Sequence, residues 1–133
     1  MTADPSTERP ELSVVIPMFN EQEVLPLLAQ RLAPVLDALT EHYEVVCVDD
    51  GSSDGTLEKL KALRQQDERV HYLSFSRNFG KEAGMYAGLE AVTGDYIAVM
   101  DVDLQDPPAL LGQMLSGIET EGFDCVATRR VTR

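Results

Sequence analysis

Short apolar runs alternate with stretches of helical periodicity along the chain, and this alternation limits the fold more than any other feature. Apolar runs, many rich in β-branched residues, predict buried strands at residues 12–16, 43–48, 70–75, 96–100 and 123–128. Helices are predicted between them, at about residues 21–41, 56–66, 81–92 and 108–121. Strands that are apolar on both faces are typical of a parallel sheet covered by helices on both sides. The sequence therefore predicts an α/β fold with a mainly parallel sheet.

Two local features refine this prediction. Asn20 precedes the first predicted helix and is a residue type that commonly caps a helix. The third predicted helix carries small residues that would allow it to pack closely on the sheet: Ala83, Gly84, Ala87, Gly88 and Ala91. Residues 1–10 are polar and are expected to form a disordered tail, and residues 11–133 are expected to form one domain.

The composition narrows the classes of partner. The chain of 133 residues has a net charge of −12, which argues against nucleic acid as a partner because phosphate backbones require Lys and Arg. No apolar run approaches the roughly 20 residues that a membrane helix needs, and no signal peptide precedes the first strand. Cys47 and Cys125 lie within apolar runs and are interpreted as buried thiols in a reducing compartment; the alternative is a disulfide between them. The chain as given is expected to be soluble and cytoplasmic.

Polar clusters follow each of the five predicted strands. They cover the segments 17–21, 49–56, 76–81, 101–106 and 129–133. The carboxyl ends of parallel strands meet at one edge of a sheet, and ligands of such sheets bind beyond that edge. The sequence therefore predicts that these clusters converge on one binding site.

The fourth cluster has the residue types of a metal site. Asp101 and Asp103 are two residues apart at the end of a strand, so their side chains should point to the same side, with Gln105 just beyond. Such oxygen ligands suit Mg2+ or Mn2+ when a substrate phosphate completes the coordination shell. The alternative is a solvated acidic turn.

The second cluster could recognise a nucleobase. Asp50, with the Val48 backbone beside it, could accept N–H hydrogen bonds from uracil or guanine, and Asp49 is a second candidate. The alternative is that these acids only build the turn and cap the next helix, as is expected of at least one member of the set Asp49, Ser52, Ser53 and Asp54.

The remaining clusters suggest further contacts with the same ligand. The first could cradle a ribose and base through Pro17, Phe19 and Glu21, or could be an ordinary strand-to-helix turn. Arg129 and Arg130 follow the fifth strand and are suited to bind a diphosphate, unless they form a solvated basic end. By the same reasoning, two cations of the third cluster could assist: Arg77 and Lys81.

Four of these segments together resemble glycosyltransferase family 2. They read VVIPMFNE at 14–21, VDDGSSDGT at 48–56, RNFGK at 77–81 and MDVDLQDPP at 100–108. Within the family they are most similar to dolichyl-phosphate mannose synthases and bacterial polyprenyl-phosphate glycosyltransferases. The chain departs from the usual pattern at Phe19, where the family usually has Tyr, and at Val102, where it usually has Ala.

The resemblance implies a Rossmann-like GT-A fold and a set of ligand contacts. It implies binding of a nucleoside-diphosphate sugar, linked to UDP or GDP, through Pro17, Phe19, Glu21, Val48, Asp50, Asp101, Val102, Asp103 and Arg130. It also implies a divalent metal, Mg2+ or Mn2+, at Asp101, Asp103 and Gln105. The sugar would be transferred with inversion to a polyprenyl phosphate.

The resemblance also implies a longer enzyme. This chain would be its nucleotide-sugar-binding portion, with a catalytic base and an acceptor-facing or membrane segment beyond residue 133. The complete form would then act at the cytoplasmic face of the membrane, and a homo-oligomer is left open. Alternatives are a soluble transferase that acts on a saccharide hydroxyl, a fragment that only binds nucleotide, and a response-regulator receiver domain. A receiver would need a Lys after its phosphorylated Asp, and none follows Asp101.

Overall fold

The structure of the chain is a computed structural model that describes residues 10–100. Its elements, in chain order, are β1 (Leu12–Met18), α1 (Leu25–Leu39), β2 (Tyr43–Asp49), α2 (Thr56–Gln66), β3 (Val70–Ser74), α3 (Lys81–Ala91) and β4 (Tyr96–Val99). These bounds confirm the predicted alternation, in most cases within two residues. The predicted tail up to residue 9, the helix predicted at 108–121 and the strand predicted at 123–128 lie outside the described residues.

The four described strands form a parallel sheet in the order β3-β2-β1-β4. β1 lies at its centre, where Val15 is in register with Val46 of β2 and with Val99 of β4. The chain moves outward in one direction from β1 to β3 and then returns to place β4 on the other side of β1. The strand order therefore reverses between β1 and β4, which is the position where open α/β sheets bind their ligands.

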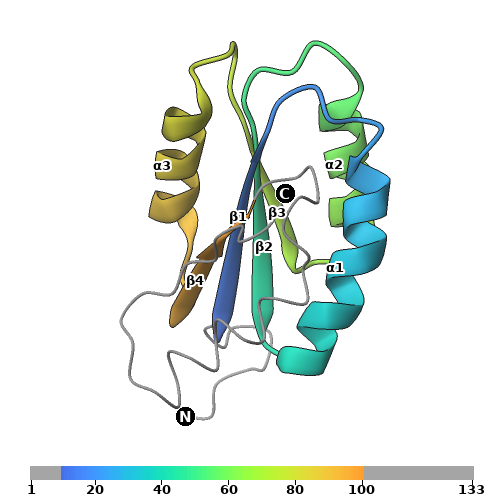
Figure 1. The fold of residues 1–133 in the computed structure, drawn as a ribbon, viewed down its shortest axis with the longest axis vertical. Coiled ribbons are helices and arrows are strands. Elements are labelled where there is room, and N and C mark those ends of the chain that lie inside the picture. The colour runs from blue at the N-terminus through green and yellow to red at the C-terminus, as the bar shows by residue number, and fades with distance from the viewer. Residues whose placement is uncertain (1–9, 101–133) are drawn as a thin grey trace, which may run out of the picture.

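Helices cover both faces of this sheet, as predicted. Figure 1 shows α1 and α2 on one side of the strands and α3 on the other. Every residue of β1 and β2 is buried, which agrees with strands that are apolar on both faces.

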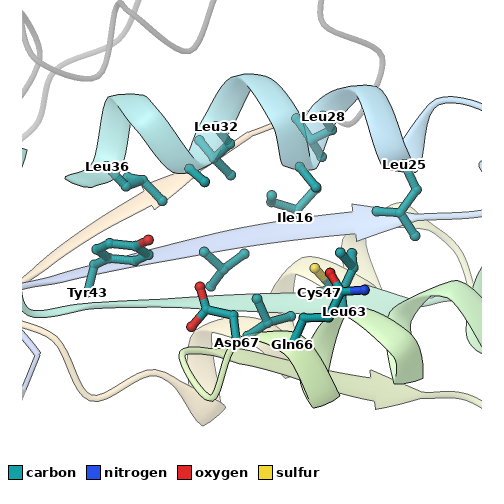
Figure 2. A pocket seen from close by; sticks show the side chains of 14 residues that line it. Ile16, Leu25, Leu28, Leu32, Leu36, Tyr43, Cys47, Leu63, Gln66 and Asp67 are labelled. Carbon is teal, nitrogen blue, oxygen red and sulfur yellow. The ribbon is translucent and has the colours of Figure 1, made fainter. Parts of the chain in front are cut away.

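The face under α1 is filled by large side chains. Leucines at helical spacing turn toward the strands, and each is at most 4% exposed: Leu25, Leu28, Leu32 and Leu36. They pack in one core with alternate residues of the strands, such as Ile16 and Cys47. Figure 2 shows these leucines above a cavity of about 280 Å³, with Tyr43 near one end and Leu63 and Gln66 of α2 below. This cavity lies inside the α1 face of the sheet, away from the loops that follow the strands.

The opposite face is packed by glycines of α3. Gly84 and Gly88 are the buried residues of this helix. A Cβ atom at Gly84 would lie 3.4 Å from the Pro17 Cβ, whereas one at Gly88 would overlap Val15 Cγ1. The predicted close approach of this helix to the sheet is therefore confirmed at these two positions.

The beginning of α1 differs from the prediction. The helix starts at Leu25, and its cap residue Val24 makes no side-chain hydrogen bond to the helix. The predicted cap, Asn20, lies four residues before that position with a φ of 53°, and its side chain accepts a hydrogen bond from the Ser53 amide. The capping prediction is wrong because Asn20 bonds to a neighbouring loop instead of to its own helix.

A network of polar side chains lies at the amino ends of the strands, at the edge of the sheet opposite to the carboxyl ends. The Glu44 carboxylate accepts hydrogen bonds from Ser13 Oγ at 2.6 Å and from the Thr93 amide at 2.8 Å. Ser13 Oγ in turn accepts one from the Gly94 amide at 2.8 Å. These bonds tie the segment after α3 to β1 and β2, so the buried Glu44 is satisfied and acts structurally.

Candidate functional site

Three loops meet at the carboxyl edge of the sheet, at the top of Figure 1. They follow β1, β2 and β3. The first two are joined by reciprocal hydrogen bonds: the Asn20 amide donates to Ser52 Oγ at 2.9 Å, and the Ser53 amide donates to Asn20 Oδ1 at 2.8 Å. The Gly55 amide also donates to Gln22 Oε1 at 2.8 Å. The predicted convergence is confirmed for the clusters that follow these three strands.

Two acids of the second loop build its turn and the start of α2. The Asp49 carboxylate accepts a hydrogen bond from the Ser52 amide at 3.1 Å. Asp54 accepts hydrogen bonds from the amide and hydroxyl of Thr56, the first residue of α2. Desolvation raises the pKa of Asp54, but the hydrogen bonds from Thr56 and Gln22 outweigh it, so the pKa is lowered. Asp54 thus bonds to the first residue of α2 from the position before the N-cap residue, Gly55, which has no side-chain cap, and Asp49 has a turn-forming role.

Asp50 instead bonds to the loop that follows β3. Its two carboxylate oxygens accept hydrogen bonds from the amides of Phe79, at 2.7 Å, and of Gly80, at 3.0 Å. Its backbone carbonyl accepts a third from Asn78 Nδ2 at 3.2 Å. Because of these contacts, Asp50 is only 4% exposed.

Gly51 completes the contact between these two loops. It has a φ of +71°, and a Cβ atom at this position would overlap the backbone of Arg77 and Asn78. Glycine is therefore required both by its conformation and by the close approach of the second backbone. The segments 48–56 and 77–81, which the sequence presents as separate motifs, form one structural unit.

The other predicted nucleoside contacts lie around this unit. Pro17 and Val48 are register partners at the ends of β1 and β2, and Gly84 of α3 covers both. Phe19 is 44% exposed, and the Glu21 amide donates to Thr56 Oγ1 at 2.9 Å. The structure thus brings Pro17, Val48 and Asp50 to one edge, with Phe19 and Glu21 in the loop beside them.

The loop after β3 also carries positive charge to this edge. The Arg77 guanidinium lies 4.9 Å from the centre of the Phe79 ring, a cation–π arrangement. The Phe79 ring in turn meets Phe75 edge to face, with ring centres 5.6 Å apart. These contacts hold the predicted Arg77 at the edge, and Lys81 begins α3 just beyond it.

The remaining predicted site residues lie outside the described residues. They are Asp101, Val102, Asp103, Gln105, Arg129 and Arg130. Within residues 10–100, no group of three His, Cys, Asp or Glu side chains could hold a metal ion. The described chain ends at Met100, whose amide donates to the Val15 carbonyl at 2.9 Å. Met100 therefore lies on the side of β1 where the strand order reverses, and Asp101 follows it in the sequence.

Some residues that build this edge were not predicted from the sequence. Asn20 and Gln22 join the first two loops, and Asn78 helps to join the second and third. Their signal in the sequence is weak, because each bonds to a partner about 30 residues away and that partner depends on the strand order.

A parallel sheet with interlocked polar loops near the point where the strand order reverses is typical of open α/β proteins, which bind their ligands at the carboxyl edge. The family model described as Glycosyl transferase family 2 matches residues 13–133. The chain belongs to glycosyltransferase family 2, and its described portion has the fold predicted for this family, the GT-A fold. The receiver-domain alternative is thereby excluded.

Curated relatives extend well beyond this chain. It is 41% identical over 124 residues to the undecaprenyl-phosphate 4-deoxy-4-formamido-L-arabinose transferase of Photorhabdus laumondii, an alignment that covers 92% of this chain and 38% of the relative. It is 43% identical over 119 residues to the putative glycosyltransferase CsbB of Bacillus subtilis, covering 90% of this chain and 36% of the relative. The chain thus spans little more than a third of the length of these relatives.

Solved structures share the fold at lower identity. The mannosyltransferase PcManGT from Pyrobaculum calidifontis, in complex with GDP-Man and Mn2+, matches with a TM-score of 0.65 and 23% identity, over 88% of this chain and 34% of that one. TarS 1-349 of S. aureus in complex with UDP matches with a TM-score of 0.57 and 23% identity, over 79% and 33% of the two chains. Among the described residues of this chain, no helix has the length and apolar character required to cross a membrane.

Proposed function

We propose that residues 11–133 form the nucleotide-sugar-binding domain of an enzyme that transfers a sugar from a UDP- or GDP-linked donor to a polyprenyl phosphate. The observation that carries this proposal is the convergence of three interlocked polar loops at the carboxyl edge of the sheet. Family membership gives the reaction class, and the name of the Photorhabdus relative indicates a polyprenyl phosphate acceptor.

The nucleoside is proposed to bind across β1 and β2. Pro17 and Val48, register partners near the ends of these strands, would contact the base and ribose through their backbone, since their side chains pack under α3. Phe19, exposed in the first loop, would contact the nucleoside from the side, with Glu21 beside it. Asp50 would accept an N–H of the base. These residues lie on elements held by hydrogen bonds between loops, which favours a preformed site.

The diphosphate is proposed to lie toward the segment that follows β4. Asp101, Asp103 and Gln105 offer carboxylate and amide oxygens, a donor set that suits Mg2+ or Mn2+. A divalent ion bound there would neutralise charge on the leaving diphosphate. The Val102 backbone would adjoin the nucleotide, and Arg130, with Arg129 beside it, would pair with the diphosphate oxygens.

The acceptor chemistry follows from its charge. A polyprenyl phosphate is already anionic near neutral pH, so its oxygen needs less help from a general base than a hydroxyl would. Attack on the anomeric carbon forms the new C–O bond as the nucleoside diphosphate leaves from the opposite side, which inverts the configuration. The acceptor-binding segments are proposed to lie in the part that the relatives have and this chain does not cover, at the cytoplasmic face of the membrane.

Isothermal titration with UDP and GDP, each with Mn2+ and with EDTA, tests this proposal. We expect at least one nucleotide to bind with Mn2+ and to lose most of its affinity in EDTA. Asp103→Asn should abolish the metal-dependent part of binding while leaving the circular dichroism spectrum unchanged, and Asp106→Asn is the matched control. Failure of both nucleotides to bind would contradict the proposed function for this chain, and unchanged affinity in Asp103→Asn would remove the metal site.

A further inference from the structure

The cavity under α1 has no part in the proposed nucleotide site. It has a volume of about 280 Å³ and lies between α1, the central strands and α2 (Figure 2). Most of its lining is apolar, with leucines of α1 on one side and Ile16 and Val45 of the strands on the other. An apolar cavity of about 150 Å³ already stays dry and binds a benzene molecule. This larger cavity therefore has room for a small apolar ligand.

The cavity is long and narrow. Its lining residues on α1 run from Leu25 to Leu36, a length of about 16 Å at the helical rise. Those on β2 run from Tyr43 to Cys47, a length of about 13 Å along a strand. A volume of 280 Å³ spread over this length has a mean cross-section of about 20 Å². Such a space suits a single extended hydrocarbon chain that lies parallel to α1.

The end of the cavity near Cys47 is shielded from solvent. Cys47 is 3% exposed, and burial raises the pKa of its thiol to about 12. A hydrocarbon chain that enters this end leaves water and meets an apolar lining, which is favourable in proportion to the area that it buries.

The rim of the cavity carries charged side chains that are already paired. Arg69 lies 3.0 Å from Asp67 and 3.2 Å from Asp37. Asp37 also accepts a hydrogen bond from the Tyr43 hydroxyl at 3.0 Å. A charged head group on a ligand would have to compete with these pairs. Gln66 lines the cavity and is exposed to solvent, so its uncharged amide marks the opening and can bond to a hydroxyl.

We propose that the cavity under α1 is a binding site for a small uncharged amphiphile with a single hydrocarbon chain. The chain lies along the leucines of α1, and the head group stays at the rim beside Gln66, in contact with water. Because this site is separate from the loops at the carboxyl edge, the inference does not rest on the proposed function.

Isothermal titration of the chain with 1-butanol, 1-hexanol and 1-octanol tests this inference. Each further methylene that is buried should tighten binding about fourfold, the equivalent of about 0.8 kcal/mol. Octanoate should bind more weakly than 1-octanol, because Arg69 at the rim is already paired with two carboxylates. Absence of binding by all three alcohols, an affinity that does not rise with chain length, or octanoate that binds as tightly as 1-octanol would overturn the inference.

A variant that fills the cavity tests its location. Ala33 lines the cavity, so Ala33→Leu should occupy the space and weaken 1-octanol binding at least about tenfold. Ala38→Leu is the matched control, because Ala38 is exposed on the same helix, and its affinity for 1-octanol should equal that of the wild type. Unchanged affinity in Ala33→Leu would contradict the inference.

Methyl NMR of the wild-type chain locates the alcohol without any variant. On addition of 1-octanol, the methyl signals of Leu28, Leu32 and Val45 should shift, because these side chains are buried around the cavity. Those of Leu27 and Leu89, which are exposed, should not. Shifts confined to the exposed leucines would mean that the alcohol binds to the surface, and the inference would fail.

Discussion

The two faces of the sheet are packed in different ways. On the α1 face, four leucines reach across to the strands and leave a cavity of about 280 Å³ (Figure 2). On the α3 face, Gly84 and Gly88 bring the helix backbone against Val15, Pro17 and Val48, and at Gly88 no space remains for a methyl group. Pro17 and Val48 are proposed nucleoside contacts, and α3 begins directly after the two amides that bond to the Asp50 carboxylate. The tightly packed face is therefore the one that positions the candidate site, whereas the α1 face mainly supplies stability.

Truncation of a leucine on the α1 face should have the largest effect on stability. Leu28 is 2% exposed, so Leu28→Ala removes buried apolar contacts and enlarges the cavity. We expect a loss of about 2–5 kcal/mol in the free energy of unfolding, measured by urea denaturation. Leu27→Ala is the matched control, because Leu27 is 48% exposed on the same helix. Equal losses in the two variants would show that α1 is not packed on the sheet through Leu28.

Addition of one methyl group on the α3 face should have the next largest effect. In Gly88→Ala the new Cβ would overlap Val15 Cγ1, and overpacking of this kind costs about 1–3 kcal/mol, partly offset by the higher helix propensity of alanine. Because the helix must move away from the strands, UDP affinity should fall as well.

The control for this variant lies one turn earlier on the same helix. In Gly84→Ala the nearest atom is the Pro17 Cβ, at 3.4 Å, so we expect stability equal to or above that of the wild type. If Gly88→Ala is as stable as Gly84→Ala in thermal denaturation, the tight packing of this face is refuted.

These two faces also show how much of the molecule could be predicted from the sequence. The strands, the helix order and the close packing of α3 follow from patterns that are local in the chain, namely apolar runs and small residues at helical spacing. The hydrogen-bond partners of polar side chains do not follow from local patterns, because they depend on the strand order β3-β2-β1-β4. Asn20 was predicted to cap α1 and bonds to Ser53 instead, and the role of Glu44 in joining Ser13 to Thr93 has no local signature.

The candidate site likewise combines features that could be predicted from the sequence with features that could not. The convergence of polar clusters on one edge could be predicted, since parallel strands end together, and it is confirmed for the loops after β1, β2 and β3. The hydrogen bonds to the Asp50 carboxylate could not be predicted, because they come from two backbone amides of a loop about 30 residues away. The roles of Asp101, Asp103, Gln105 and Arg130 stay predictions, since these residues lie outside the described part of the chain.

A larger side chain on the α1 face should be tolerated, in contrast to the α3 face. Ala33 lines the cavity, so the added atoms of Ala33→Leu can enter existing space. We expect the free energy of unfolding to stay within about 1 kcal/mol of the wild type or to increase. A loss as large as that of Gly88→Ala would show that both faces are equally intolerant, and the contrast between them would fail.

The last expected effect concerns alkaline pH and again belongs to the α1 face. Burial raises the pKa of the Cys47 thiol from 9.0 to about 12. Desolvation, together with a hydrogen bond to Asp37, raises that of Tyr43 from 10.0 to about 12. Between the unfolded and the folded pKa of each group, the unfolded chain has released a proton that the folded chain still holds. The contribution of these groups to the free energy of unfolding is therefore fully present below pH 9 and falls as the pH rises toward 12.

Removal of the thiol separates the two contributions. Urea denaturation of Cys47→Ala between pH 8 and about 10.5 should show a shallower decline in stability than that of the wild type, because only Tyr43 of the pair then contributes. An unchanged slope would mean that the Cys47 thiol ionises as readily in the folded chain as in the unfolded one. That result would require water to reach Cys47 through the cavity under α1. The cavity would then be a solvated opening and not part of an apolar core.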